Sequence, residues 1–195
     1  MTAVALLRHY PTDWNVERRL QGHIDRPLTP EARNKLSELR LPEPWSGSRM
    51  IASTLSRTHE TADLLSAGCE VHTDERLIEI GWGDWEGRRA KDMLSDPTSG
   101  FVPTGDMGWN ARPPNGESMA DAWARLQPAL AEIAAGPPAV IVTHKAVMRV
   151  ILGFAWKWQI PDGGIEIKRG RLYPLTLRPN GMPVRPRDPI RLSAR

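Results

Sequence analysis

The sequence contains a single cysteine, Cys69, which therefore has no partner for an internal disulfide bond. The N-terminus lacks the basic segment and the long apolar segment of an export signal. No apolar run approaches the ~20 residues that a membrane-spanning helix needs. The longest run, AVMRVILGFAW, is about half that length and carries Arg149. We therefore expect a soluble, cytoplasmic protein without a membrane partner.

The chain also lacks a strong excess of either charge. Its 26 lysine and arginine residues face 23 aspartate and glutamate residues, which gives a net charge of +3. This bias does not predict a nucleic-acid partner unless the basic residues are concentrated. They are partly concentrated in the proline-rich segment 183–195, which holds Arg185, Arg187, Arg191 and Arg195. An exposed tail is favoured there over a binding arm, because interleaved aromatic residues are missing.

Repeats, linker-like tracts and metal motifs are absent as well. The 195 residues are therefore expected to form one domain, residues 1–195, which buries roughly 70% of the surface of the unfolded chain. The sequence has no cysteine pair, no His-Glu-x-x-His motif and no Gly-Lys-Ser/Thr loop. It thus indicates neither a metal site nor a bound cofactor.

What the sequence does contain is an alternation of short apolar runs with helical patterns. The apolar runs predict strands over 3–7, 50–53, 139–143 and 172–177. The helical patterns cover 29–40, 56–68, 118–136 and 145–155. Two of the strands are continuously apolar, as in strands covered on both faces, so we predict a three-layer α/β/α sandwich. Asn180-Gly181 predicts a hairpin after the last strand, and hence a mixed, mostly parallel sheet.

The segment from about residue 80 to 117 has little periodicity. It holds several tryptophans and prolines, among them Trp82 and Trp109. A loop of this length inside a compact domain is commonly a lid or a substrate-binding loop.

Charged residues follow the predicted strands. Arg8 and His9 end the first strand, Arg57 follows the second, and His144 follows the strand over 139–143. Ligands in open α/β sheets bind beyond the carboxyl ends of the strands. With Glu79 nearby, these residues would meet at one edge of the sheet and form a site for an anion.

These segments carry a resemblance to a known family. LLRHYPTDWN resembles the Arg-His-Gly-Glu-Thr motif of the histidine phosphatase (phosphoglycerate mutase-like) superfamily. Further segments resemble that family's motifs in the same order: LQGHIDRPLTPEAR, STLSRTHETA, EIGWGDWEG, PPNGES and VIVTHKAVMRVIL. The resemblance spans Leu6 to about Leu152, and it implies a phosphoglycerate mutase-like fold.

The resemblance also implies roles for individual residues. His9 would be the nucleophile that accepts the phosphoryl group, and Glu79 the proton donor. The phosphate oxygens would be surrounded by Arg8, Arg57 and His144. Substrate-binding residues would be Thr12, Asn15, Gln21, Gly22 and Lys145. Glu86 is a rival to Glu79, but it matches a Trp-Glu-Gly segment whose role looks structural.

These residue types suit phosphoryl transfer independently of the family. A phosphate ester repels a nucleophile, and each cation in contact offsets this by roughly 4 kcal/mol at an effective dielectric constant near 20. Arginine binds two phosphate oxygens at once and stays charged. Histidine attacks only through a deprotonated nitrogen, and neighbouring cations favour that neutral form. A protonated Glu79 would then protonate the leaving oxygen.

The sequence departs from the family's pattern at three places, of which Ala32, at a position that is commonly glycine, costs little inside a helix. Tyr10-Pro11 replaces the usual Gly-Glu, which adds a ring beside the nucleophile and removes a backbone donor. Lys145 replaces the glycine that usually follows the second histidine, and its ammonium group would favour an acidic substrate. No charged catalytic group is lost, so we expect activity with an unusual substrate preference.

Three functions remain open on the sequence. The first is a metal-independent phosphomonoester hydrolase that acts on a small phosphorylated metabolite and releases inorganic phosphate. The second is a cofactor-dependent mutase, disfavoured because those mutases have a longer insertion than Arg88 to Pro113 allows. The third is a non-catalytic phosphate-binding or interaction module. A sugar phosphate, α-ribazole phosphate and a phosphoprotein all stay open as substrates, and the sequence does not indicate an oligomeric state.

Overall fold

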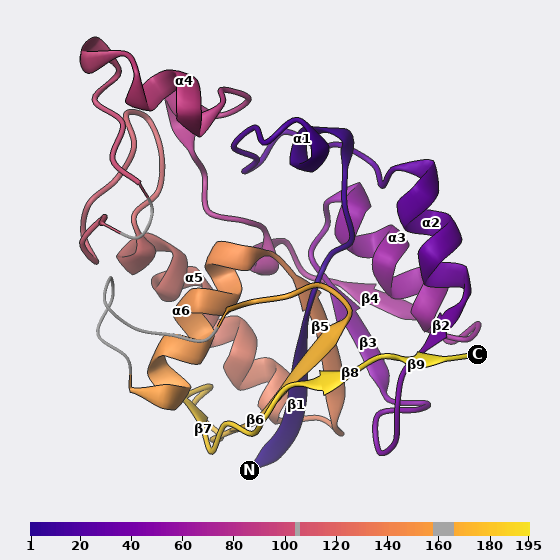
Figure 1. Cartoon of the computed structure of the whole chain (residues 1–195). Helices are drawn as coiled ribbons and strands as arrows, with labels where there is room; N and C mark the ends of the chain where they lie inside the picture. The colour runs from indigo at the N-terminus through magenta and orange to yellow at the C-terminus, as the bar shows by residue number, and fades with distance from the viewer. Residues whose placement is uncertain (104–105, 158–165) are drawn as a thin grey trace.

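The chain forms a central mixed β-sheet with helices on both faces (Figure 1). The structure, a computed structural model, describes residues 1–103, 106–157 and 166–195. The strands are β1 (Thr2–Arg8), β2 (Leu39–Arg40), β3 (Arg49–Ala52), β4 (Val71–Thr73), β5 (Ala139–Thr143), β6 (Arg171–Leu177), β7 (Pro183–Val184), β8 (Ile190–Arg191) and β9 (Ser193–Ala194). The α-helices are α1 (Asp13–Val16), α2 (Pro30–Ser37), α3 (Ser56–Leu65), α4 (Ala90–Leu94), α5 (Met119–Ala134) and α6 (Lys145–Trp156).

The seven-stranded sheet has the order β4-β3-β5-β1-β6-β7, and β8 also pairs with β6. Strands β4, β3, β5 and β1 are parallel, whereas β6 runs antiparallel to β1. Strand β7 is antiparallel to β6, so the predicted hairpin is present. The predicted fold class, an α/β/α sandwich around a mixed and mostly parallel sheet, is confirmed.

Strand β1 shows why both faces of the sheet must be covered. Its residues alternate between two hydrophobic cores: Val4 and Leu6 pack with α5 and α6, whereas Ala5 and Leu7 pack with α2 and α3. All four side chains are fully buried. The continuous apolarity of the strand therefore reflects two separate cores, one on each side.

The helices begin where the sequence provides capping side chains. Thr29 caps α2 by accepting a hydrogen bond from the amide of Ala32 at 3.1 Å, and Pro30 occupies the first helical position. Ser118 and Asp121 form a reciprocal capping box at the start of α5. All four long helices lie within the predicted ranges to within one residue, although α2 and α3 end about one turn earlier than predicted.

Short elements account for most of the differences from the sequence-based expectation. Strand β4 has only three residues, and none of them is buried, so its sequence has no strong apolar signal. The predicted loop 80–117 contains α4 and two 3₁₀ helices, Gly83–Trp85 and Pro97–Ser99. Another 3₁₀ helix, Glu75–Leu77, precedes it.

Segment 183–195 is not the free tail that was expected. It forms β7 and β8 on the main sheet, and β9 pairs with β2. Leu192 is buried and its amide donates to the carbonyl of Gly170 at 3.0 Å. The arginines are exposed, as expected, but the alternating apolar residues between them anchor the backbone.

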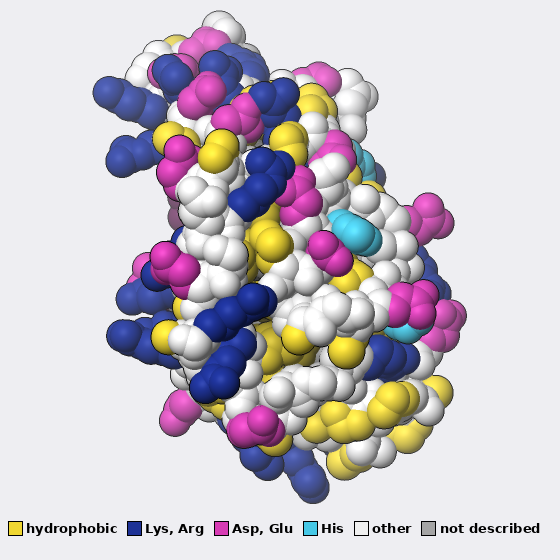
Figure 2. All heavy atoms as spheres, turned by 90° about the vertical axis from the view of Figure 1, so that its right-hand side faces the viewer, with side chains coloured by type: hydrophobic (Ala, Val, Ile, Leu, Met, Phe, Trp, Pro, Cys, Tyr) yellow, Lys and Arg dark blue, Asp and Glu magenta, His cyan; other side chains and the backbone are white. Residues whose placement is uncertain are grey.

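The face that carries α2 and α3 has side chains of both charges (Figure 2). An ion pair joins Arg33 of α2 to Glu60 of α3 at 2.7 Å, and Lys35 pairs with Glu38 at 2.8 Å. Within the described ranges, no helix combines the length and apolarity that crossing a membrane would require.

Candidate active site

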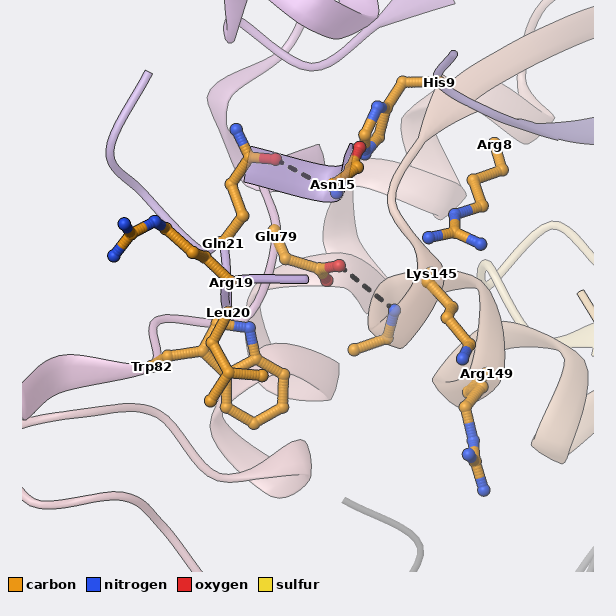
Figure 3. A pocket seen from close by; sticks show the side chains of 11 residues that line it. Arg8, His9, Asn15, Arg19, Leu20, Gln21, Glu79, Trp82, Lys145 and Arg149 are labelled. Atoms are coloured by element: carbon orange, nitrogen blue, oxygen red, sulfur yellow. Dashed lines mark hydrogen bonds between the residues drawn. The ribbon is translucent and has the colours of Figure 1, made fainter. Parts of the chain in front are cut away.

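The carboxyl ends of the parallel strands bring predicted site residues, first of all Arg8 and His9, to one edge of the sheet. Arg8 ends β1, and the amide of His9 donates to the carbonyl of Thr143 at the end of β5, at 3.0 Å. A pocket of about 180 Å³ opens at this edge (Figure 3). It is lined by Arg8, His9, Asn15, Arg19, Leu20, Gln21, Glu79, Trp82, Lys145, Ala146 and Arg149.

His9 is held in one tautomer. Its Nδ1 lies 2.7 Å from the carbonyl oxygen of Tyr10, and because a carbonyl only accepts, Nδ1 carries the proton. In the neutral ring, Nε2 is therefore unprotonated and free to act as a nucleophile. Burial, followed by the nearby charges of Arg57 and Arg169, holds the pKa of His9 well below its usual value. The neutral, nucleophilic form is thus the stable one at neutral pH.

Arg8 presents an unpaired guanidinium group to the pocket. No hydrogen bond or ion pair joins this group to any residue in the described part of the chain, and its Nε is buried without a partner. Burial lowers the pKa of Arg8, and the charge of Glu79 opposes this shift. A half-buried cation with unused donors is a ready site for an anion, because an anion would supply the missing hydrogen bonds.

Glu79 provides a buried carboxyl group on the pocket wall. Its oxygens accept hydrogen bonds from the amides of Ile80, Ala146 and Val147 at 3.0, 3.2 and 3.2 Å. Burial raises the pKa of Glu79, although these hydrogen bonds favour the ionised form. The group is therefore suited to both donate and accept a proton.

The backbone of Glu79 is fixed by two side chains. Its carbonyl accepts from Arg125 at 3.0 Å and from His23 Nε2 at 2.9 Å. Arg125 also forms two hydrogen bonds with Glu117, both at 2.9 Å, and Glu117 accepts from the amide of Gly81. Burial of Glu117 alone would raise its pKa, but the hydrogen bonds from His23 and Arg125 lower it strongly. This ionised network holds the segment around Glu79 against α5.

Arg57 and His144 lie behind His9 and do not line the pocket. Both are fully buried, and the ring centroids of His9 and His144 are 5.2 Å apart. Arg57 Nε donates to His144 Nδ1 at 3.3 Å, so His144 carries its proton on Nε2, which lies 2.8 Å from the Ser53 hydroxyl. Burial lowers the pKa of Arg57 to about 10, which leaves it charged. That these two side chains surround the phosphate stays a prediction; the structure places His144 beside His9 and Arg57 against His144.

The predicted substrate-binding residues divide into two groups. Asn15, Gln21 and Lys145 line the pocket, and Gln21 Nε2 is a buried donor without a partner. Thr12 caps α1, and its hydroxyl donates to Gln21 Oε1 at 2.9 Å. Gly22 is also occupied, because its carbonyl accepts from Arg57 at 2.7 Å. Thr12 and Gly22 shape the site from behind it.

Glu86, the rival to Glu79, lies outside the pocket. Its Oε1 accepts hydrogen bonds from the amides of Gly22 and Ile24. It therefore holds the loop that carries the Gly22 carbonyl, and its carboxylate is not directed at the nucleophile.

Arg169 is a site residue that the sequence interpretation missed. It precedes β6, and its Nε donates to the carbonyl of His9 at 3.0 Å while its second amino group donates to Asn15 Oδ1 at 2.8 Å. Burial lowers its pKa to about 10, with Arg8 adding to the shift. No local pattern in the sequence marks Arg169, because its place beside His9 depends on the antiparallel pairing of β6 with β1. No cluster of three or more metal-ligating side chains occurs within 1–103, 106–157 and 166–195.

Comparison with known proteins identifies the group to which this site belongs. A model of the histidine phosphatase superfamily (branch 1) matches residues 4–185, which is most of the chain. The chain belongs to the histidine phosphatase superfamily. It is 36% identical over 151 residues to "Probable phosphoglycerate mutase GpmB" of Enterobacter sp. (strain 638), covering 74% of this chain and 70% of that protein.

Solved structures of the superfamily have the same fold. Bacillus stearothermophilus YhfR is 28% identical, with a TM-score of 0.76 over 92% of this chain and 93% of that one. A mycobacterial glucosyl-3-phosphoglycerate phosphatase is 25% identical, with a TM-score of 0.74 over 90% and 93% of the two chains. The similar proteins thus include some named as mutases and others named as phosphatases.

The structure explains how this member of the superfamily accommodates two of its departures from the usual motifs. Tyr10 is buried in the core beside α2 and α3, so its ring does not line the pocket. Lys145 is the first residue of α6 and has an ordinary helical backbone, so its side chain is accommodated there without backbone strain. The departure that changes the pocket is therefore Lys145.

Proposed function

We propose that the protein is a phosphomonoester hydrolase that works through a phosphohistidine on His9. The observation that carries this proposal is the pocket itself. It combines the unprotonated Nε2 of a neutral His9, the unpaired guanidinium of Arg8 and the raised pKa of Glu79. These supply a nucleophile, an anion-binding group and a proton donor on one wall.

The first half-reaction transfers the phosphoryl group to the protein. Nε2 of His9 attacks phosphorus, the bond to the ester oxygen breaks, and Glu79 donates its proton to that oxygen so that the product leaves as an alcohol. Arg8 and the free amide donor of Gln21 hold the phosphoryl oxygens during this step. Arg169 fixes the backbone of His9, and the hydrogen bond from Nδ1 to the carbonyl of Tyr10 fixes the orientation of its ring.

The second half-reaction releases inorganic phosphate. The ionised Glu79 accepts a proton from water, the resulting hydroxide attacks phosphorus, and the bond to Nε2 breaks. His9 and the protonated Glu79 are thereby regenerated. No group other than these side chains and water is needed to balance the reaction.

A mutase is the second candidate, because several relatives are named as phosphoglycerate mutases. A mutase returns the phosphoryl group to another hydroxyl of the substrate, whereas a hydrolase gives it to water. The pocket is open to solvent beside Lys145, which is exposed, and this supports transfer to water.

The experiment compares the two outcomes in one reaction. Purified protein is incubated with 3-phosphoglycerate and with a panel of phosphorylated metabolites in the presence of a chelator, and free phosphate and 2-phosphoglycerate are both measured. We expect phosphate release that His9→Ala abolishes and that His59→Ala, a substitution at an exposed histidine, preserves. Formation of 2-phosphoglycerate without phosphate would establish the mutase instead. If no substrate gave any product, the interpretation as a non-catalytic phosphate-binding module would be favoured.

A further inference from the structure

Two basic side chains of α6 face the pocket without partners. Lys145 and Arg149 both line it, and their spacing of four residues places them on the same face of the helix. Within the described part of the chain, neither side chain forms a hydrogen bond or an ion pair. Figure 3 shows them along one side of the pocket, below Arg8 and opposite Leu20 and Trp82.

Of the other two arginines in the pocket lining, Arg19 is paired and, among the described residues, Arg8 is not. Arg19 forms an ion pair with Glu17 at 2.6 Å and donates to the carbonyl of Gly87. Arg88 lies 3.5 Å from the carboxylate of Asp96. Three basic side chains of the pocket lining, Arg8, Lys145 and Arg149, are therefore available to an anion.

The lining of the pocket carries more positive than negative charge, because four basic side chains lie there beside Glu79. Among the lining residues that belong to the described part of the chain, Glu79 is the only carboxylate, and its oxygens are already bound by three amides. Partial burial, followed by the charges of Arg8 and Arg149, lowers the pKa of Lys145. Repulsion between neighbouring cations is relieved when an anion binds between them.

A single phosphoryl group does not occupy the whole wall. The phosphoryl group must lie against His9, which attacks it. Arg8, the neighbour of His9 in sequence, also lines the pocket and binds the same group. Arg149 lies four residues into α6, about 6 Å along the helix from Lys145. These two side chains are thus placed to meet a different part of the substrate from the part that meets Arg8.

We propose that Lys145 and Arg149 form a subsite for a second anionic group, so that the preferred substrates are small phosphomonoesters that also carry a carboxylate or a second phosphate. The inference rests on the proposed function and specifies its substrate class. The pocket volume of about 180 Å³ limits the substrate to a small metabolite, because drug-sized ligands occupy roughly 300–1,000 Å³.

The test uses substrates that differ only in the second group. 3-Phosphoglycerate is compared with glycerol 3-phosphate, which replaces the carboxylate by a hydroxymethyl group, and propane-1,3-diyl bisphosphate is compared with 3-hydroxypropyl phosphate. We expect the wild-type kcat/KM to favour the doubly anionic member of at least one pair by tenfold or more. The pair that shows the preference distinguishes a carboxylate from a second phosphate.

Two variants then locate the preference. In the double variant Lys145→Met, Arg149→Met, the ratio of kcat/KM between the doubly anionic substrate and its partner should fall to about one-tenth of the wild-type ratio. The fall should come mainly from a higher KM for the doubly anionic substrate. Arg178→Gln is the control, because this exposed arginine follows β6 at the opposite end of the sheet, where Leu177 pairs with Thr2. A wild-type enzyme without a preference, or a preference that survives in the double variant, would overturn the subsite.

A binding measurement separates this proposal from the proposed function. Calorimetry on His9→Ala compares the affinities of the same pairs without turnover, and then repeats the comparison with the two α6 substitutions added. Tighter binding of the doubly anionic ligand, lost with those substitutions, supports the subsite even if no hydrolysis is found. Equal binding within each pair overturns it.

Discussion

At the scale of single residues, the chemistry depends on which nitrogen of His9 carries a proton. The carbonyl of Tyr10 fixes that proton on Nδ1, and burial among arginines keeps the ring neutral. Glu79 has the opposite requirement, because it must begin the cycle protonated, and burial favours that form. The two groups are therefore tuned by the same low-dielectric environment toward complementary roles.

Replacement of Glu79 by glutamine tests its role as proton donor. The variant retains the shape of the side chain but has no acidic proton to donate. We expect kcat for an alkyl phosphate to fall about 10²-fold or more, whereas p-nitrophenyl phosphate, whose leaving group is already stable as an anion, should lose much less. The measurement is kcat of the wild type and of the variant with each of the two substrates. Equal losses for the two would mean that Glu79 is not the donor.

The pH dependence follows from the same shifts. The rate should decline as pH rises through the raised pKa of Glu79, because the donor loses its proton. On the acid side the rate should decline only well below pH 6.5, the usual pKa of histidine. The nucleophile is lost when His9 becomes protonated, and the pKa of His9 lies well below that value. Glu79→Gln should lack the alkaline decline while retaining any contribution from titration of the substrate. An alkaline decline that is identical in the variant would contradict this assignment.

At the scale of elements, the site depends on loops held by backbone contacts. Gly22 connects its own loop to two other segments, since its amide donates to Glu86 and its carbonyl accepts from Arg57 of α3. A Cβ at this position would lie 2.7 Å from the carbonyl oxygen of Ile80 and 3.0 Å from the amide of Trp82. Both contacts are with backbone atoms, which have no rotamer to change.

Gly22→Ala should therefore be destabilising. We expect a loss of about 1–3 kcal/mol in the free energy of unfolding, together with reduced activity as Arg57 is displaced. Gly108→Ala is the matched control, because within the described part of the chain no atom beyond its two chain neighbours lies within 4 Å of the added Cβ. Denaturant unfolding of the two variants measures the difference. Equal stabilities would show that the loop at Gly22 shifts freely.

The sequence predicted the elements whose signals are local and strong. Strands β1 and β5 are continuously apolar, and α2 and α5 begin at capping residues, so these were found. Motif order placed Arg8, His9 and Glu79 in one pocket. The pairing of β9 with β2 was not predictable, because each strand has only two residues and the two segments lie far apart in the sequence. The buried positions of Arg57 and His144 and the contribution of Arg169 likewise depend on tertiary packing that no local pattern records.

At the scale of the whole molecule, the C-terminal segment connects the chain end to the site. Leu192 donates its amide to Gly170, the neighbour of Arg169, which in turn bonds to the carbonyl of His9. Deletion of residues 189–195 removes β8, β9 and the buried side chain of Leu192. We expect a loss of about 2–4 kcal/mol in stability, from this apolar burial and the lost hydrogen bonds.

The control for this deletion is Arg191→Gln, since Arg191 is exposed and its removal leaves the backbone pairing intact. Thermal unfolding of both proteins should show a marked decrease for the deletion and little change for the substitution. A deletion variant as stable as the full chain would show that the segment contributes nothing to the fold.

The formation of phosphohistidine is the central claim, and the intact mass of the protein tests it most directly. Protein is mixed briefly with a phosphate ester, quenched without acid so that the phosphorus–nitrogen bond survives, and measured beside His9→Ala treated in the same way. We expect the wild-type chain to gain one phosphoryl group and the variant none. A wild-type protein that releases phosphate without any such gain, or a His9→Ala variant that gains the same group, would contradict the account.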